Sequence, residues 1–188
     1  MLCSLVNIND RVITFLYSYV NAHFRSFFSR FRCYRSLMMN EVIMYYAGSN
    51  WTGVSLDEFL SCRHNLAHDR QTRMLADLRP LGCYNSSALP PSVRRPLLLR
   101  SAASNLRRMA FFGLTERLAD SARLFERRFG VHFDVALRQY STTHGDEQAR
   151  RLSETDRRRV HLANQLDTKL YEYARRLFER RMRKTMTK

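Results

Sequence analysis

The chain has 188 residues, 45% of them hydrophobic, which is enough for one domain with a core and argues against wholesale disorder. Its 32 Lys and Arg outnumber its 17 Asp and Glu. The resulting charge of +15 predicts a polyanionic partner without distinguishing nucleic acid, anionic lipid and sulfated polysaccharide. Almost every base is Arg, whose guanidinium group binds phosphate or sulfate through paired hydrogen bonds, although a lineage bias toward Arg would produce the same excess.

Residues 1–44 are rich in Phe, Tyr and Met and differ in character from the rest of the chain. The longest apolar run, residues 12–20, is far shorter than the roughly 20 residues of a membrane-spanning helix. Asp10 stands where a signal peptide would be basic, so we expect neither a membrane span nor a cleavable signal. A loose helical spacing runs through Phe24, Phe27, Phe28 and Phe31. It fits an amphipathic helix at a membrane surface, ordinary helical packing or a non-native start of the chain.

Three helices are predicted between residues 55 and 108. Ser55 and Glu58 form a capping-box pattern that starts a short helix. Asp69 opens a second helix, which Pro80 ends, and residues 82–91 form a loop. The apolar stripe of this helix is Met74, Leu75 and Leu78. A third helix covers residues 92–108, and its predicted inward-facing residues are Leu97, Leu98 and Ala102.

The second half of the chain is predicted to hold two short strands and two further helices. The apolar run 109–114 is the best candidate for a buried strand, and 131–137 is a weaker one. Between them lies a helix that Gly130 ends. The last helix is long and places one residue on the same face at each turn, namely Leu162, Leu166, Leu170, Tyr173 and Leu177. Arg side chains occupy its other surfaces, which predicts a solvated basic helix, with a polyanion-binding groove as the alternative.

Metal and modification signals are few. The cysteines are Cys3, Cys33, Cys62 and Cys83. They include no C-x-x-C pair, so we expect no metal site. Asn50 and Asn85 lie in N-glycosylation sequons, which are used only in a secretory compartment.

Several ordered motifs together resemble the heparan-sulfate 6-O-sulfotransferase family. The first is W-T-G followed by E-F from Trp51, then R-Q-T-R-M-L-A-D-L at 70–78 and G-C-Y-N at 82–85. Later motifs are MAFFGLTE at 109–116, LFERRF at 124–129, LRQYSTTHG at 137–145 and the closing helix at 164–178. The resemblance extends from about Tyr45 to Arg181, and its abrupt start favours a non-native segment at 1–44.

The resemblance implies an α/β fold of the P-loop-like sulfotransferase type, built around a central parallel sheet. We expect this chain to hold an incomplete domain, predominantly helical, with one or two short strands at about 109–114 and 131–137. The expected organisation is an unmatched segment at 1–44, a partial sulfotransferase domain at 45–183 and a tail at 184–188. The implied reaction moves a sulfuryl group from 3′-phosphoadenylyl sulfate to the 6-hydroxyl of glucosamine in heparan sulfate. The family consists of Golgi membrane glycoproteins.

The resemblance also assigns site residues. The implied nucleotide loop consists of Arg138, Gln139, Tyr140, Thr142, Thr143, His144 and Gly145. It departs from the family pattern at Ser141 and His144, where the family has Asn and Arg. Cys62 and Cys83 match family cysteines and are predicted to form a disulfide. Asn85 matches the position of a family sequon.

The family's Lys-Thr-Gly-Gly-Thr phosphate loop does not occur in this sequence, and no His matches the family's catalytic base. We therefore assign no catalytic residue and expect no transferase activity from this chain alone. The alternative function is non-catalytic binding of a polyanion, either heparan sulfate or nucleic acid. Nucleic acid is the weaker choice because the sequence has no recognition motif for it.

Overall fold

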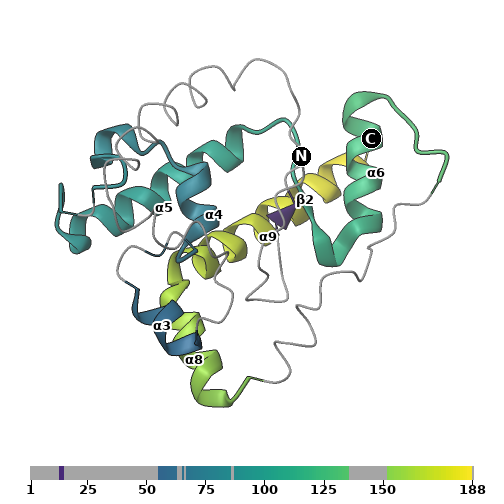
Figure 1. Ribbon diagram of the computed structural model, residues 1–188. Helices are drawn as coiled ribbons and strands as arrows, with labels where there is room; N and C mark the ends of the chain where they lie inside the picture. Colours follow the sequence, from purple (N-terminus) through teal and green to yellow (C-terminus); the bar gives the residue numbers. More distant parts are fainter. Residues whose placement is uncertain are drawn as a thin grey trace. The chain divides into compact units, whose positions relative to one another are not determined.

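The computed structural model describes residues 13–14, 55–62, 65, 67–85, 87–135 and 152–187, and it is predominantly helical, as predicted (Figure 1). The elements in chain order are β1 (Ile13–Thr14), α3 (Leu56–Ser61), α4 (Arg70–Leu75), the 3-10 helix η1 (Arg79–Leu81), α5 (Pro91–Arg108), β2 (Gly113–Leu114), the 3-10 helix η2 (Thr115–Arg117), α6 (Leu118–Phe129), α8 (Glu154–Ala163) and α9 (Gln165–Met186).

The chain divides into two compact units, and the divisions fall within α5, α9 and the end of α8. The first unit consists of residues 1–18, 106–160 and 171–188. The second consists of residues 19–105 and 161–170. Each unit has its own buried apolar residues, so each is described separately.

In the second unit, α5 forms as predicted, and its inward face is narrower than expected. Leu98 is 5% exposed and Ala102 is fully buried, whereas Leu97 is 37% exposed. Residues four apart lie on one face of a helix and adjacent residues lie about 100° apart, so Leu97 turns away from the face that Leu98 and Ala102 share. The prediction that Leu97 faces inward is therefore wrong.

The capping box of the first predicted helix is confirmed. The Ser55 hydroxyl accepts a hydrogen bond from the Glu58 amide at 3.2 Å, and the Glu58 carboxylate accepts one from the Ser55 amide at 2.9 Å. These two bonds satisfy amides that have no partner within the helix, which is why α3 begins here.

Helix α4 is shorter than predicted, because it ends at Leu75 and not at Pro80. Ala76 has an extended backbone, and Pro80 lies within η1. Side chains of α5 satisfy the backbone groups that a longer helix would have bonded internally. Asn105 donates to the Leu75 carbonyl at 2.6 Å, and the Ser101 hydroxyl accepts from the Asp77 amide at 2.8 Å.

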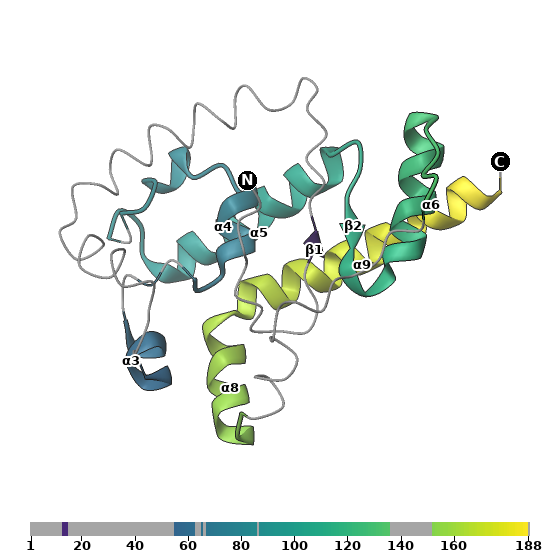
Figure 2. The same cartoon turned by 45° about the vertical axis from the view of Figure 1, so that its right-hand side comes forward.

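In the first unit, only the last two residues of the predicted strand 109–114 are extended and paired. β2 pairs with β1 in an antiparallel register, Ile13 opposite Leu114, whereas the resemblance implies a parallel sheet (Figure 2). Residues 109–112 bond differently, since the Met109 carbonyl accepts from the Arg181 guanidinium at 2.9 Å. The Phe112 ring is fully buried and lies 6.2 Å from the Phe178 ring.

The second predicted strand is wrong over residues 131–135, which form no strand. Val131 is 46% exposed and Val135 is 74% exposed, so the apolar residues of this stretch do not form a buried face. The Phe133 amide donates to the Glu126 carboxylate at 2.8 Å, which removes it from any strand ladder. Residues 136 and 137 lie outside the described part of the chain.

The predicted closing helix is divided into α8 and α9 at Asn164. Leu162, expected on the apolar face, is 54% exposed, whereas Leu166, Leu170 and Leu177 are buried as predicted. Among the described residues, no helix has the length and apolar character needed to cross a membrane.

Candidate functional site

The predicted nucleotide loop, Arg138 to Gly145, lies outside the described residues, and so does Asn50.

Asn85 is described and exposed. Its side-chain oxygen accepts from the Ser87 amide at 3.0 Å. The Arg94 guanidinium donates to the carbonyls of Asn85, at 3.2 Å, and Cys83, at 2.5 Å. The sequon at Asn85 therefore stands on an exposed loop that α5 holds in place.

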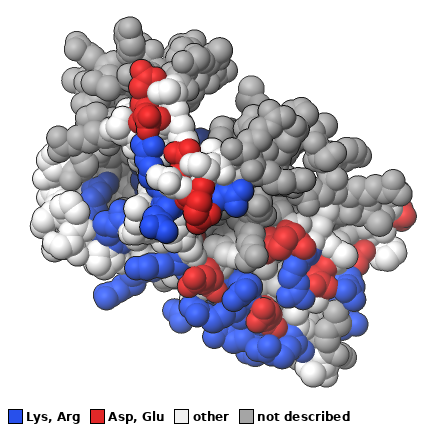
Figure 3. All heavy atoms as spheres, turned by 90° about the horizontal axis from the view of Figure 1, so that it is seen from below, with Lys and Arg blue, Asp and Glu red and all other residues white. Residues whose placement is uncertain are grey.

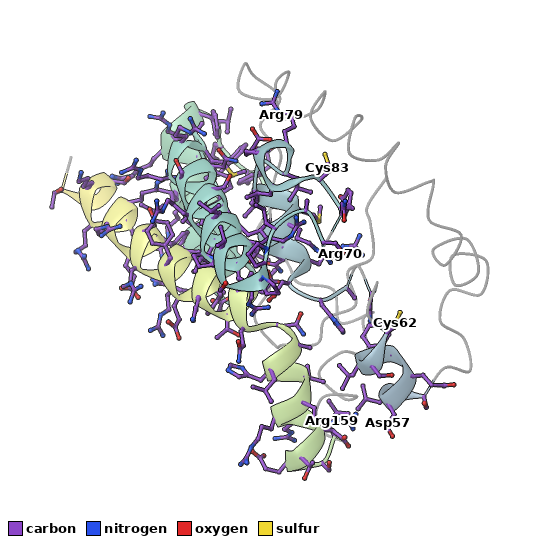
Figure 4. All side chains as sticks on the ribbon, turned by 90° about the vertical axis from the view of Figure 1, so that its left-hand side faces the viewer. Asp57, Cys62, Arg70, Arg79, Cys83 and Arg159 are labelled. Atoms are coloured by element: carbon purple, nitrogen blue, oxygen red, sulfur yellow. The ribbon has the colours of Figure 1, made fainter. Side chains whose placement is uncertain are left out.

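The predicted disulfide between Cys62 and Cys83 is not formed. Cys62 is a free, partly buried thiol, and Cys83 is disulfide-bonded, so Cys62 is not its partner. Cys62 ends α3, and Cys83 lies in the turn after η1 with a left-handed φ of 55°. Figure 4 shows the two sulfur atoms well apart on these separate elements. A disulfide requires the two Cα atoms to lie within about 7 Å, so matching the family's cysteine positions was not enough to pair them.

A buried polar cluster joins the start of α4 to the start of α9. Asp167 accepts from the amides of Gln71, at 3.0 Å, and Thr72, at 2.7 Å. Asp69 accepts from the amides of Leu166, at 2.8 Å, and Asp167, at 3.3 Å. Each aspartate thus bonds amides at the amino terminus of the other helix that have no partner within that helix, and the helix dipole also favours negative charge there.

Other side chains complete this cluster. The Asn164 side-chain oxygen accepts from the Asp69 amide at 3.1 Å, and the Thr72 hydroxyl donates to Asp167 at 2.6 Å. Arg95 lies 3.4 Å from the Asp69 carboxylate. Burial raises the pKa of Asp69, and the Leu166 amide acts in the opposite direction. Because its groups bond one another, the cluster holds two helices together and offers no free group for catalysis.

From the sequence, Asp69 was predicted only as a helix start, and its pairing with Asp167 was not predicted. Asp69 has a left-handed φ of 47° and makes no side-chain cap on its own helix. The available signal was that Asp69 and Asp167 each stand at the start of a helical motif of the family pattern, at R-Q-T-R-M-L and N-Q-L-D.

His68, considered and rejected as a base from the sequence, lies in a packed environment. Its Nε2 is 3.4 Å from the Asn65 side-chain nitrogen, and its ring packs edge-on at 6.2 Å from the Phe59 ring. Burial lowers the pKa of His68, and the positive charge of Arg73 adds to this effect. The neutral imidazole is therefore the favoured form in the folded chain.

The basic residues of α9 fall into two kinds. Arg181 is partly buried, and its Nη2 donates to the carbonyls of Arg107 and Met109, at 2.9 Å each. Its guanidinium carbon lies 5.0 Å from the centre of the Phe112 ring, which is a cation–π contact. Burial lowers the pKa of Arg181. Arg181 is one of the arginines expected on the solvated surfaces of the last helix, whereas the structure gives it a packing role.

The other basic residues of α9 are exposed to solvent, namely Lys169, Arg175, Arg176, Arg180, Arg183 and Lys184. Figure 3 shows many blue Lys and Arg side chains on the face drawn, with red Asp and Glu side chains among them. Within the described part of the chain, no group of three or more His, Cys, Asp and Glu is arranged to bind a metal ion. The described residues thus offer fixed positive charge, which binds anions and does not by itself transfer a group.

These motifs and basic elements match one class of protein. The sequence model of the sulfotransferase family matches residues 14–174, and the chain belongs to this family. The match begins ahead of Tyr45, where the motif resemblance begins, and it includes part of β1. The boundary at residue 45 stays a prediction.

Within this family, the chain is similar to heparan-sulfate 6-O-sulfotransferases. It is 47% identical over 136 residues to heparan-sulfate 6-O-sulfotransferase 1 of Homo sapiens, covering 72% of this chain and 33% of that protein. It is 44% identical over 147 residues to heparan-sulfate 6-O-sulfotransferase 2 of Gallus gallus, covering 78% of this chain and 36% of that protein. The chain spans about a third of the length of these relatives.

Proposed function

We propose that this chain forms part of a P-loop-like sulfotransferase domain that transfers a sulfuryl group from 3′-phosphoadenylyl sulfate to the 6-hydroxyl of glucosamine units in heparan sulfate. One observation carries the proposal: the chain is 44–47% identical over most of its length to proteins named for this activity. Two of the matched motifs, R-Q-T-R-M-L and N-Q-L-D, also meet in space through the Asp69 and Asp167 cluster.

The role proposed for this chain's own residues is nucleotide binding. The loop from Arg138 to Gly145 contributes the hydroxyl groups of Tyr140, Thr142 and Thr143 and the Gln139 amide. These groups are suited to bonding a phosphate or an adenine edge. His144 replaces the Arg of the family pattern, and an imidazole holds an anion less firmly than a permanently charged guanidinium group. When bound, 3′-phosphoadenylyl sulfate supplies the sulfuryl group.

The proposal extends to location and modification, which rest on the family alone. We place the protein in the Golgi as a membrane-associated glycoprotein, with Asn85 the favoured glycan site and Asn50 the second.

The sequence has no Lys-Thr-Gly-Gly-Thr loop, and amides of such a loop at a helix start bind the phosphosulfate. Purified 1–188 is therefore expected to transfer no sulfuryl group, and 6-O-sulfation of heparan sulfate by it would contradict this.

A chimera tests the activity. Residues 45–181 replace the matching segment of human heparan-sulfate 6-O-sulfotransferase 1, and transfer of labelled sulfate to the 6-hydroxyl of de-6-O-sulfated heparan sulfate is measured. We expect the chimera to retain activity, since 47% identity preserves the motifs and their order. A chimera that folds and is secreted but transfers nothing would overturn the proposed function.

The nucleotide loop is tested in the same chimera. Substituting Thr142→Val and Thr143→Val removes two hydroxyl groups and is expected to raise KM for the sulfuryl donor by about tenfold, with little change in KM for the glycan. The control is Thr187→Val, at an exposed position just after α9. For this control the grafted segment is extended to residue 188. Equal KM values for donor in all three proteins would exclude this loop from the nucleotide site.

A further inference from the structure

The exposed side of α9 in the first unit carries three arginines in line, Arg176, Arg180 and Arg183, which we call the arginine strip. Their spacings of four and three residues place them on one side of the helix on successive turns. At about 1.5 Å of rise per residue, the strip is roughly 10 Å long.

The three guanidinium groups are available to a ligand. All three residues are exposed, and no described residue forms an ion pair or hydrogen bond with these guanidinium groups. Glu172 and Glu179 border the strip along one edge, each four residues before an arginine of the strip, without forming an ion pair to it. Within the described part of the chain, the three arginines of the strip outnumber the two acids beside them and are not engaged in ion pairs.

The opposite side of α9 is fixed by packing. Ala174 and Phe178 are fully buried, and the Arg117 guanidinium carbon lies 5.3 Å from the Phe178 ring centre. Arg181 bonds the carbonyls of Arg107 and Met109. These contacts fix the rotation of the helix about its axis, so the arginine strip is held on the solvent-facing side of α9.

We propose that the arginine strip binds a sulfated glycan chain, as a docking surface for heparan sulfate separate from the nucleotide loop. This inference rests on the proposed function for the choice of glycan. Guanidinium groups form paired hydrogen bonds with sulfate oxygens, and a line of them on successive turns follows a linear polyanion.

A glycan fits the strip better than a nucleic acid. Proteins that bind single strands stack bases on aromatic side chains, and no aromatic residue of α9 is exposed among those described. Tyr171 and Tyr173 are partly buried, and Phe178 is fully buried. A purely ionic surface of this kind suits a polymer whose charge lies on sulfate and carboxylate groups along its length.

The test measures binding of the 188-residue chain to a heparan sulfate dodecasaccharide by fluorescence anisotropy at several salt concentrations. The triple variant R176Q/R180Q/R183Q removes the strip. We expect its Kd to rise by about tenfold or more near physiological salt, with a shallower salt dependence because three ionic contacts are lost. The matched control, R100Q/R107Q/R128Q, removes the same charge from three exposed arginines elsewhere, and its Kd is expected to rise by less than about threefold.

Equal weakening by the two triple variants would overturn the proposal, because net charge alone would then explain binding. The variant R176K/R180K/R183K preserves charge and loses paired hydrogen bonding, so intermediate affinity supports the strip even if the Gln variant is poorly folded. Single-stranded DNA of matched length that competes as well as the glycan would overturn the choice of partner.

These outcomes are independent of the chimera assay. If the chimera is inactive and glycan binding depends on the strip, the proposed function is wrong and the docking surface is supported. If the chimera is active and glycan binding does not depend on the strip, the proposed function is supported and the docking surface is wrong.

Discussion

Asp69 and Asp167 each bond the amino terminus of the helix to which the other belongs. The Asp167 carboxylate accepts from amides of α4, 95 residues away at Thr72, and the Asp69 carboxylate accepts from amides at the start of α9, 97 residues away at Leu166. The free amides of two helix starts are thereby satisfied in a buried position. The exchange explains why α9 begins anew after Asn164 and does not simply continue α8.

Replacing Asp167 is expected to destabilise the chain. Asp167→Ala leaves the amides of Gln71 and Thr72 and the Thr72 hydroxyl without their partner, at a cost of about 1–3 kcal/mol. Asp167→Asn keeps an accepting oxygen and is expected to cost less. Urea unfolding followed by circular dichroism measures both. Glu154→Ala, at an exposed first-turn position of α8, is the control, and an equal loss there would contradict the capping role.

Gly113 is required for a close contact with α6. A Cβ at residue 113 would lie 2.9 Å from the Cβ and hydroxyl oxygen of Ser121, and Ser121 is only 4% exposed. Gly113→Ala is therefore expected to cost about 1–3 kcal/mol of the free energy of unfolding, because a packed helix must shift.

Gly130 offers the contrast, because it ends α6 with a φ of 66° and a Cβ there would meet nothing within 4 Å. Its requirement is conformational, and Asn tolerates left-handed backbone better than most residues. Gly130→Asn is thus expected to cost less than about 1 kcal/mol, whereas Gly113→Asn costs more than Gly113→Ala. A Gly113→Asn protein as stable as Gly130→Asn would contradict the packing explanation.

The cysteine chemistry predicts a labelling pattern. In non-reduced, folded protein, Cys62 is expected to react with a maleimide and Cys83 to resist it until a reductant is added. Peptide mass spectrometry assigns the labelled sites. Cys62→Ser should leave the protection of Cys83 unchanged, whereas a Cys83 thiol that becomes reactive in this variant would restore the pairing that the structure contradicts.

His68 makes stability depend on pH. Burial lowers the pKa of His68 from its ordinary value of 6.5, so just below that value the unfolded chain binds more protons than the folded chain. Its contribution to stability is complete above about pH 6.5 and is lost as pH falls through the folded pKa. Unfolding measured at pH 7.5 and pH 5.5 should show a larger loss for the natural chain than for His68→Gln. A titration of the His68 ring by NMR with a midpoint above 6.5 would contradict the sign.

The capping box at Ser55, the helix α5 and the end of α6 at Gly130 were all predicted from the sequence. In each case the signal acts within one or two helical turns: a hydroxyl reaches an amide three residues away, or a glycine adopts a left-handed backbone. The family was also recognisable, since its motifs are short and ordered along the chain. The nucleotide loop at 138–145 stays a prediction.

The features that sequence analysis missed depend on groups that meet from distant positions. Asn105 and Ser101 hydrogen-bond backbone groups just after α4, where the helix was predicted to continue. The Arg181 guanidinium, 72 residues from Met109, donates to the Met109 carbonyl within a predicted strand. Cys62, at the end of α3, is likewise free although the family pattern predicts its pairing with Cys83.

By itself, the sequence determined the family, the helical character and the local starts and stops of several helices, because those depend on neighbours within a few residues. Only the tertiary structure decided that Asp69 and Asp167 exchange caps, that Arg181 is held in packing and that Arg176, Arg180 and Arg183 face solvent. Burial and long-range hydrogen bonding assign different roles to residues of the same type, and neither is visible in a local pattern.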